Sequence, residues 1–112
     1  MAKQVMQFRY YGENETEIGK NYPRGITKSR LKSGAAFSNY YPIIKLGIQS
    51  LPGQKFYLND ANTSIIIGST GIYELDLEGY AEITNLAFDI NGLNLIDNNP
   101  NAYLIVDIIS DK

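Results

Sequence analysis

Apolar and polar residues alternate with a period of two along several short segments of the chain. The clearest case is Ile65–Leu77, where two runs of β-favouring residues meet at the turn sequence Gly68–Gly71. After this turn, Tyr73, Leu75 and Leu77 alternate with acidic residues. A period of two places one row of side chains in a core and the other in water, so the pattern predicts a half-buried antiparallel strand. The turn itself predicts a hairpin.

Other segments have the same character and are separated by turn signals. Pro52-Gly53 and Asn59–Asn62 suit tight turns, because proline fixes its own φ, glycine adopts a positive φ and short polar side chains bond to the local backbone. Tyr103–Ile109 is almost continuously apolar, which is typical of a central strand covered on both faces. Gly12–Gly25 is polar and has no periodicity, so it predicts a long exposed loop. The remaining expected strands are Gln4–Tyr11, Ile43–Gln49, Lys55–Leu58 and Ile83–Phe88.

Two short segments carry helix signals. One or two helical turns are predicted over residues 27–33, with Thr27 or Ser29 as the N-cap. A short helix is predicted over Ile90–Asn98, because isoleucine and leucine recur there at near-helical spacing and Asp89 precedes them as a cap. Gly92 weakens this helix by about 1 kcal/mol relative to alanine.

The elements together predict an all-β fold: residues 1–112 form a single antiparallel β-sandwich or jelly-roll domain with one short helix. No apolar run approaches the roughly 20 residues that span a bilayer. The first residues, Met-Ala-Lys-Gln-Val, lack the apolar core of a secretory signal. We therefore expect a protein that is made and used without export through a membrane.

The net charge of −2 conceals a marked asymmetry. Residues 1–55 hold nine basic and three acidic residues, a net charge of +6, whereas residues 56–112 hold one basic and nine acidic residues, a net charge of −8. Such a layout can steer copies of the chain together, or attract an anionic partner to the first half. The alternative is that the two halves interleave in one sheet and neutralise each other within the monomer.

The composition excludes several kinds of chemistry. The chain has neither cysteine nor histidine, which removes disulfides, thiolate chemistry and the commonest general base and transition-metal ligand. Ser29, Ser33 and Lys32 are close in sequence, but a solvated loop explains them better than an activated serine. Caps and turns explain the Asp and Asn residues between positions 89 and 98 better than a calcium loop. We expect no enzyme activity, no metal and no cofactor.

Basic and aromatic residues gather in one part of the first half. They would suit the stacking and phosphate contacts of a single-strand binder, but the pI near 5.0 and the acidic second half oppose a polyanion. Tyrosine offers a large apolar area and one polar handle, and favours interfaces, although tyrosines can equally cover sheet edges within a monomer. The candidate interface residues are Tyr22, Arg24, Lys28, Arg30, Lys32, Tyr40 and Tyr41.

The segments Gly47–Asn59, Ile65–Leu77 and Asn99–Ile109 resemble small uncharacterised virion-associated proteins from the tail and fibre region of prophages of low-GC gut bacteria. The resemblance lies in glycine, proline and apolar positions, so no active-site residue is carried over. It implies an oligomeric β-structured protein that is made in the bacterial host cytoplasm and located in the virion. The Gly71–Leu75 strand is also similar to one in trimeric jelly-roll heads of the tumour-necrosis-factor type.

We therefore expect a non-enzymatic phage structural or adhesion protein, a tail, fibre or capsid-decoration component. Its expected partners are itself and other virion proteins, with a host surface glycan as a further candidate and neither nucleic acid nor a membrane among them. One alternative is a small phage-encoded inhibitor that binds a host defence protein or a nucleotide. A second alternative is a carbohydrate-binding module.

Overall fold

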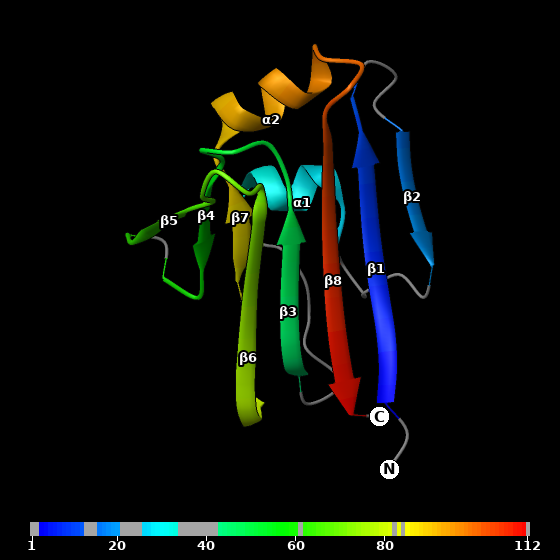
Figure 1. The fold of residues 1–112 in the computed structure, drawn as a ribbon, viewed down its shortest axis with the longest axis vertical. Helices are drawn as coiled ribbons and strands as arrows, with labels where there is room; N and C mark the ends of the chain where they lie inside the picture. The colour runs from blue at the N-terminus through cyan, green and yellow to red at the C-terminus, as the bar shows by residue number, and fades with distance from the viewer. Residues whose placement is uncertain are drawn as a thin grey trace.

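The computed structural model describes residues 3–12, 16–20, 26–33, 43–60, 62–81, 83 and 85–111. This part of the chain forms two antiparallel sheets and two helices (Figure 1). In spatial order, the large sheet contains β2 (Thr16–Lys20), β1 (Lys3–Tyr11), β8 (Tyr103–Asp111), β3 (Ile43–Gln49) and β6 (Ile72–Ala81). The small sheet contains β5 (Ser64–Ile66), β4 (Lys55–Leu58) and β7 (Leu86–Phe88). The helices are α1 (Lys28–Ser33) and α2 (Ile90–Asp97).

The antiparallel pairs β1–β8, β3–β6 and β4–β5 are nested in the sequence. The chain therefore runs as a long two-stranded ribbon across both sheets. Folding of this ribbon places β3 beside β8 and β4 beside β7. This arrangement is that of a jelly roll. One strand departs from this winding, because β2 pairs with β1 at the edge of the large sheet while α1 packs against β7. The prediction of an all-β sandwich or jelly roll is confirmed, and both predicted helical segments are present.

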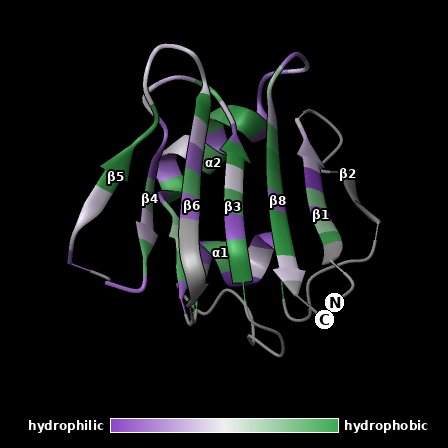
Figure 2. Ribbon diagram, turned by 60° about the horizontal axis from the view of Figure 1, so that its bottom comes forward, coloured by the Kyte–Doolittle hydropathy of each residue, from purple (hydrophilic) through white to green (hydrophobic). Residues whose placement is uncertain are grey.

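The core lies between the inner face of the large sheet and a second layer made of the small sheet and the helices. Figure 2 shows α1 and α2 on one side of the large sheet. The strand registers align Phe8, Val106 and Ile48 in one inward row across β1, β8 and β3, and all three side chains are fully buried. Phe56 of β4 joins the layers, since its ring lies 5.0 Å from the ring of Tyr73 on β6. Burying each such side chain contributes about 1.5–3 kcal/mol.

Two expectations about the strands are wrong. β8 is central, as predicted, but the described elements cover only one of its faces: Leu104, Val106 and Ile108 are buried, whereas Tyr103 is 39% exposed. β2 lies within the segment expected to be an exposed loop. It has no apolar alternation, and its pairing with β1 is the interaction that makes it a strand.

The Gly68–Gly71 turn is present, but it does not form a hairpin. The Gly71 N–H donates to the Gly68 carbonyl at 3.0 Å, and Gly71 has a φ of 72°, which favours glycine. The strands on either side belong to different sheets, β5 to the small sheet and β6 to the large one. The turn is thus the point at which the chain crosses between the layers.

The two helices begin as the sequence predicts. Thr27 caps α1, because its Oγ1 accepts a hydrogen bond from the Arg30 N–H at 3.2 Å. Asp89 occupies the N-cap position of α2, but its side chain makes no capping hydrogen bond. Leu93 and Ile96 bury the apolar side of α2. Within the described ranges, neither helix has the length and hydrophobicity that a membrane-spanning segment requires.

Candidate functional site

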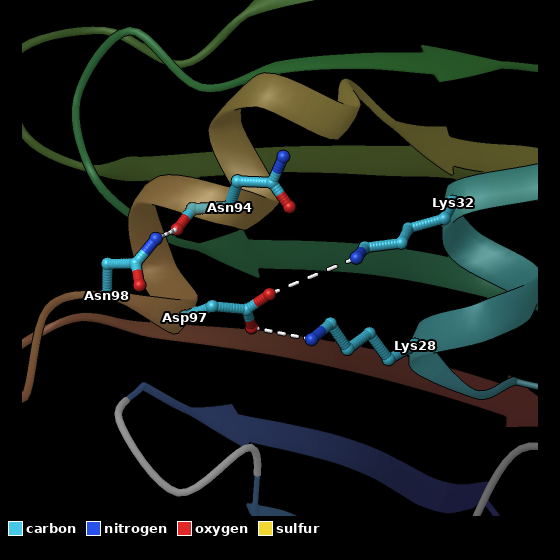
Figure 3. Close-up of polar contacts among 5 residues, drawn as sticks. All are labelled: Lys28, Lys32, Asn94, Asp97 and Asn98. Carbon is cyan, nitrogen blue, oxygen red and sulfur yellow. Dashed lines mark hydrogen bonds and ion pairs between the residues drawn. The ribbon is translucent and has the colours of Figure 1, made fainter.

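Two of the predicted interface residues form a bridge between the helices (Figure 3). Lys28 Nζ lies 2.6 Å from Oδ1 of Asp97, and Lys32 Nζ lies 3.9 Å from Oδ2 of the same carboxylate. The Lys28 ammonium also lies 4.7 Å from the centroid of the buried Tyr10 ring, a cation–π distance. Burial raises the pKa of the Asp97 carboxyl above its ordinary value. The cluster therefore ties α1 to α2 under the sheet.

Of the seven residues in the predicted basic and aromatic interface, the structure describes Lys28, Arg30 and Lys32, all on α1. Lys28 and Lys32 point toward Asp97 and are half-buried, whereas Arg30 on the same helix is exposed. The other four candidates, Tyr22, Arg24, Tyr40 and Tyr41, lie outside the described residues.

The two oppositely charged halves of the chain interleave in the large sheet. β3 from the basic half lies between β8 and β6 from the acidic half. Lys45 Nζ lies 3.9 Å from Oε2 of Glu74, and Lys28 and Lys32 meet Asp97. The two halves therefore interleave in one sheet, as one of the alternatives from the sequence supposed, and these three contacts pair opposite charges within the monomer.

No described element covers the outer face of the large sheet, since the helices lie on its opposite side (Figure 2). On an open antiparallel face, outward residues are usually polar. Here apolar side chains of β1, β8 and β6 lie among the polar ones, and Val5 is 53% exposed and Ile72 51% exposed. The outward apolar residues are Val5, Tyr11, Ile72, Tyr103, Ile105 and Ile109.

Charged groups lie on either side of the middle of this outer face, on β1 next to the edge strand β2 and on the edge strand β6. Arg9 on β1 is exposed, and on the far side Glu74 and Asp76 on β6 are exposed. The carboxylates were expected on the wet side of their strand, and the structure places them there. In the middle of the face, Gln7 Nε2 donates to Oδ1 of Asp107 at 2.6 Å, which orients both side chains. Gly47, which has no side chain, is the neighbour of Asp107 on β3.

A cleft of about 210 Å³ lies between the β3–β4 turn and α2. Gln54 lines it and is only 4% exposed, an unusual degree of burial for an amide side chain. Gln54 packs directly against Gly92, where a Cβ would collide with the amide group. The glycine that weakens α2 is therefore the residue that makes room for Gln54. The complete lining is Leu51, Pro52, Gly53, Gln54, Lys55, Asp89, Asn91, Gly92 and Leu95.

Other acidic residues have structural roles. Asp60 closes the predicted turn after β4, where its Oδ1 accepts from the Asn62 N–H at 2.9 Å and its Oδ2 from the Thr63 hydroxyl at 2.7 Å. The Asn62 backbone bond, with the Thr63 bond second, lowers the pKa of Asp60 below its ordinary value. In the described portion of the chain, no three acidic side chains gather closely enough to hold a metal ion.

Comparison of the chain with protein-family models, with curated proteins and with solved structures finds no match.

Proposed function

We propose that the protein is a non-enzymatic phage structural and adhesion protein that associates with a second copy of itself through the outer face of its large sheet. The observation that carries the proposal is the apolar character of that open face, since exposed apolar patches mark interaction sites. The virion setting rests on the resemblance of Gly47–Asn59, Ile65–Leu77 and Asn99–Ile109 to prophage virion proteins.

The charges on either side of the middle of the face favour a second copy as the partner. Two copies packed face to face about a two-fold axis parallel to the strands place β1 of one copy over β6 of the other. Arg9 shares a row with Ile72, two residues from Glu74, or roughly 7 Å along the strand. Facing sheets lie about 10 Å apart, so an arginine can reach the carboxylates of Glu74 and Asp76 on the partner. The contact occurs twice in the dimer.

The size of the face sets the expected strength of the association. Four strands that are spaced about 4.8 Å apart and are about seven residues long form a flat patch of roughly 19 by 23 Å. This outline is roughly 440 Å² on each partner, about half of the 800 Å² that a standard interface buries, so the area is that of a weak, transient association. We therefore expect a dimer that dissociates on dilution and weakens with salt.

Light scattering coupled to size-exclusion chromatography tests the association. At about 50 mM salt we expect a dimer, and at about 500 mM salt a shift toward monomer, because screening weakens the attraction between the opposite charges on the two copies. A monomer at both salt concentrations, across the accessible protein concentrations, would count against self-association.

Charge reversal tests the two-fold geometry. Arg9→Glu alone, or Glu74→Arg with Asp76→Arg, places like charges together in both contacts, and each variant should dimerise about tenfold more weakly than the wild type. An equimolar mixture of the two variants should form a heterodimer in which both contacts are restored. A mixture that stays as weak as its components would exclude this packing.

Substitutions of apolar residues test the face itself. Ile105→Lys introduces a charge at the position of a half-buried residue near its centre and should abolish the dimer, whereas Leu95→Lys, at an exposed apolar residue on α2, should leave the dimer intact. Mass spectrometry of purified particles tests the virion setting. A dimer that is absent from particles would support the alternative of a phage-encoded inhibitor.

A further inference from the structure

Two residues in the cleft beside α2 are unusual for the positions that they occupy. Glycine is a poor residue for a helix interior, and a neutral amide is rarely buried, yet Gly92 and Gln54 occupy these positions in direct contact. An apolar side chain at 54 with alanine at 92 would satisfy both rules. Each of these residues lowers the stability of the fold. When two such residues are in contact with each other, their position indicates a functional constraint.

The hydrogen bonds of Gln54 leave part of its amide available. Nε2 donates to the carbonyl oxygen of Lys55 at 3.1 Å. Within the described part of the chain, Oε1 has no hydrogen-bond partner, and the second Nε2 hydrogen has none either. A primary amide has two donor hydrogens and an acceptor oxygen, so the floor of the cleft offers one donor and one acceptor side by side.

The walls and rim of the cleft differ in character from its floor. Leu51, Pro52 and Leu95 form apolar walls, and Leu95 is 65% exposed. Lys55, Asp89 and Asn91 supply polar groups at the rim. Asp89 is at the N-cap of α2, but its carboxylate makes no capping hydrogen bond and so retains its acceptors.

We infer that this cleft binds a sugar residue that carries an acetamido group. The acetamido carbonyl accepts from Gln54 Nε2, a neighbouring ring hydroxyl donates to Oε1, and the methyl group contacts Leu51 and Leu95. The sugar hydroxyls meet the rim groups of Lys55, Asp89 and Asn91. A volume of 210 Å³ equals that of about seven liquid waters, which fits one substituted sugar ring and not an oligosaccharide.

The inference rests on the adhesion part of the proposed function and gives it a ligand class. It concerns a different surface from the one that carries self-association, because α2 lies behind the large sheet and away from its outer face (Figure 2). Sugar binding and dimer formation can therefore fail separately.

Saturation-transfer NMR on the full chain, with N-acetylglucosamine and glucose as paired probes, tests the inference. We expect transfer to the acetyl methyl group of N-acetylglucosamine, a shift of the Gln54 side-chain amide resonances, and at least about tenfold weaker binding of glucose, which lacks the acetamido group. Gln54→Met keeps the packing against Gly92 but removes the amide, and should weaken binding about tenfold. Gln49→Met, at a glutamine of the outer sheet face, is the matched control and should bind as the wild type does.

Two further variants keep the test informative if Gln54→Met does not fold. Leu95→Lys changes an exposed wall residue and should weaken sugar binding several-fold while the protein remains a dimer. Ile105→Lys should lose the dimer and retain sugar binding. The inference is overturned if the folded wild type binds neither sugar, if it binds glucose equally well, or if Gln54→Met and Leu95→Lys bind as the wild type does.

Discussion

Lys28 on α1 and Asp97 on α2 form an ion pair of 2.6 Å in which each side chain is only 13% exposed. Removing one partner leaves the other charge largely buried, with the weaker contact of Lys32 to Asp97, or of Lys28 to the Tyr10 ring, in its place. We expect Asp97→Asn and Lys28→Met each to lower the free energy of unfolding by about 2 kcal/mol. The double variant should lose less than the sum of the two. Urea denaturation of the four proteins measures this coupling, and strictly additive losses would contradict it.

The surface pair Lys45–Glu74 is the control for this cycle. Its atoms are 3.9 Å apart and its side chains are 43% and 63% exposed. Because water screens such a pair, Lys45→Met should change the free energy of unfolding by less than about 1 kcal/mol. An equal effect at Lys45 and Lys28 would show that burial is not what distinguishes them.

The Asp60 turn gives the protein a defined response to acid. Hydrogen bonds from Asn62 and Thr63 lower the pKa of Asp60 in the folded state, so its contribution to stability is present above the ordinary value of 3.8 and is lost as the pH falls through the folded value. Asp60→Asn should therefore be less stable than the wild type at neutral pH, and the difference should shrink below pH 3.8. Urea unfolding of both proteins across this range measures it. A difference that is independent of pH would exclude the carboxylate as its source.

Tyr10 is fully buried, and its hydroxyl has no hydrogen-bond partner in the described part of the structure. An unsatisfied buried hydroxyl costs about 1–3 kcal/mol, while phenylalanine keeps both the ring and the cation–π contact with Lys28. We expect Tyr10→Phe to raise the free energy of unfolding by about 1 kcal/mol. Tyr73→Phe, at a half-buried tyrosine, serves as the control and should be near neutral. A loss of stability at Tyr10→Phe would reveal a partner for the hydroxyl.

Local patterns in the sequence predict most of the strands. Ile43–Gln49 and Lys55–Leu58 form strands with the predicted bounds, because alternation and turn residues are short-range signals. Thr16–Lys20 was missed, since a polar edge strand is defined by its neighbour and not by its own pattern. The Gly68–Gly71 turn was found from its composition, but the sheet that each flanking strand joins depends on contacts distant in sequence.

The candidate sites depend more heavily on tertiary contacts. Gly92 is recognisable in the sequence as a weak point in a helix, but nothing local connects it to Gln54, 38 positions earlier. The apolar run around Ile105 and Ile109 reads as a strand covered on both faces, and only the arrangement of layers shows that one face is open. Sequence patterns thus identify unusual residues, whereas the fold decides which of them meet.

Gly53 and Gly71 both have a positive φ, 86° and 72°, but their surroundings differ. A Cβ at Gly53 would meet nothing within 4 Å, whereas one at Gly71 would lie 2.7 Å from the backbone oxygen of Ser50. Gly53→Ala should therefore lower the free energy of unfolding by about 1–2 kcal/mol, the penalty for placing a non-glycine residue at a positive φ. Gly71→Ala should lower it by roughly 1–3 kcal/mol more, because the added Cβ is also too close to Ser50. Thermal unfolding of the two variants compares them directly. Equal losses would mean that the crossing between the sheets can shift away from Ser50, and that the close approach at Gly71 is not required for the two layers to pack.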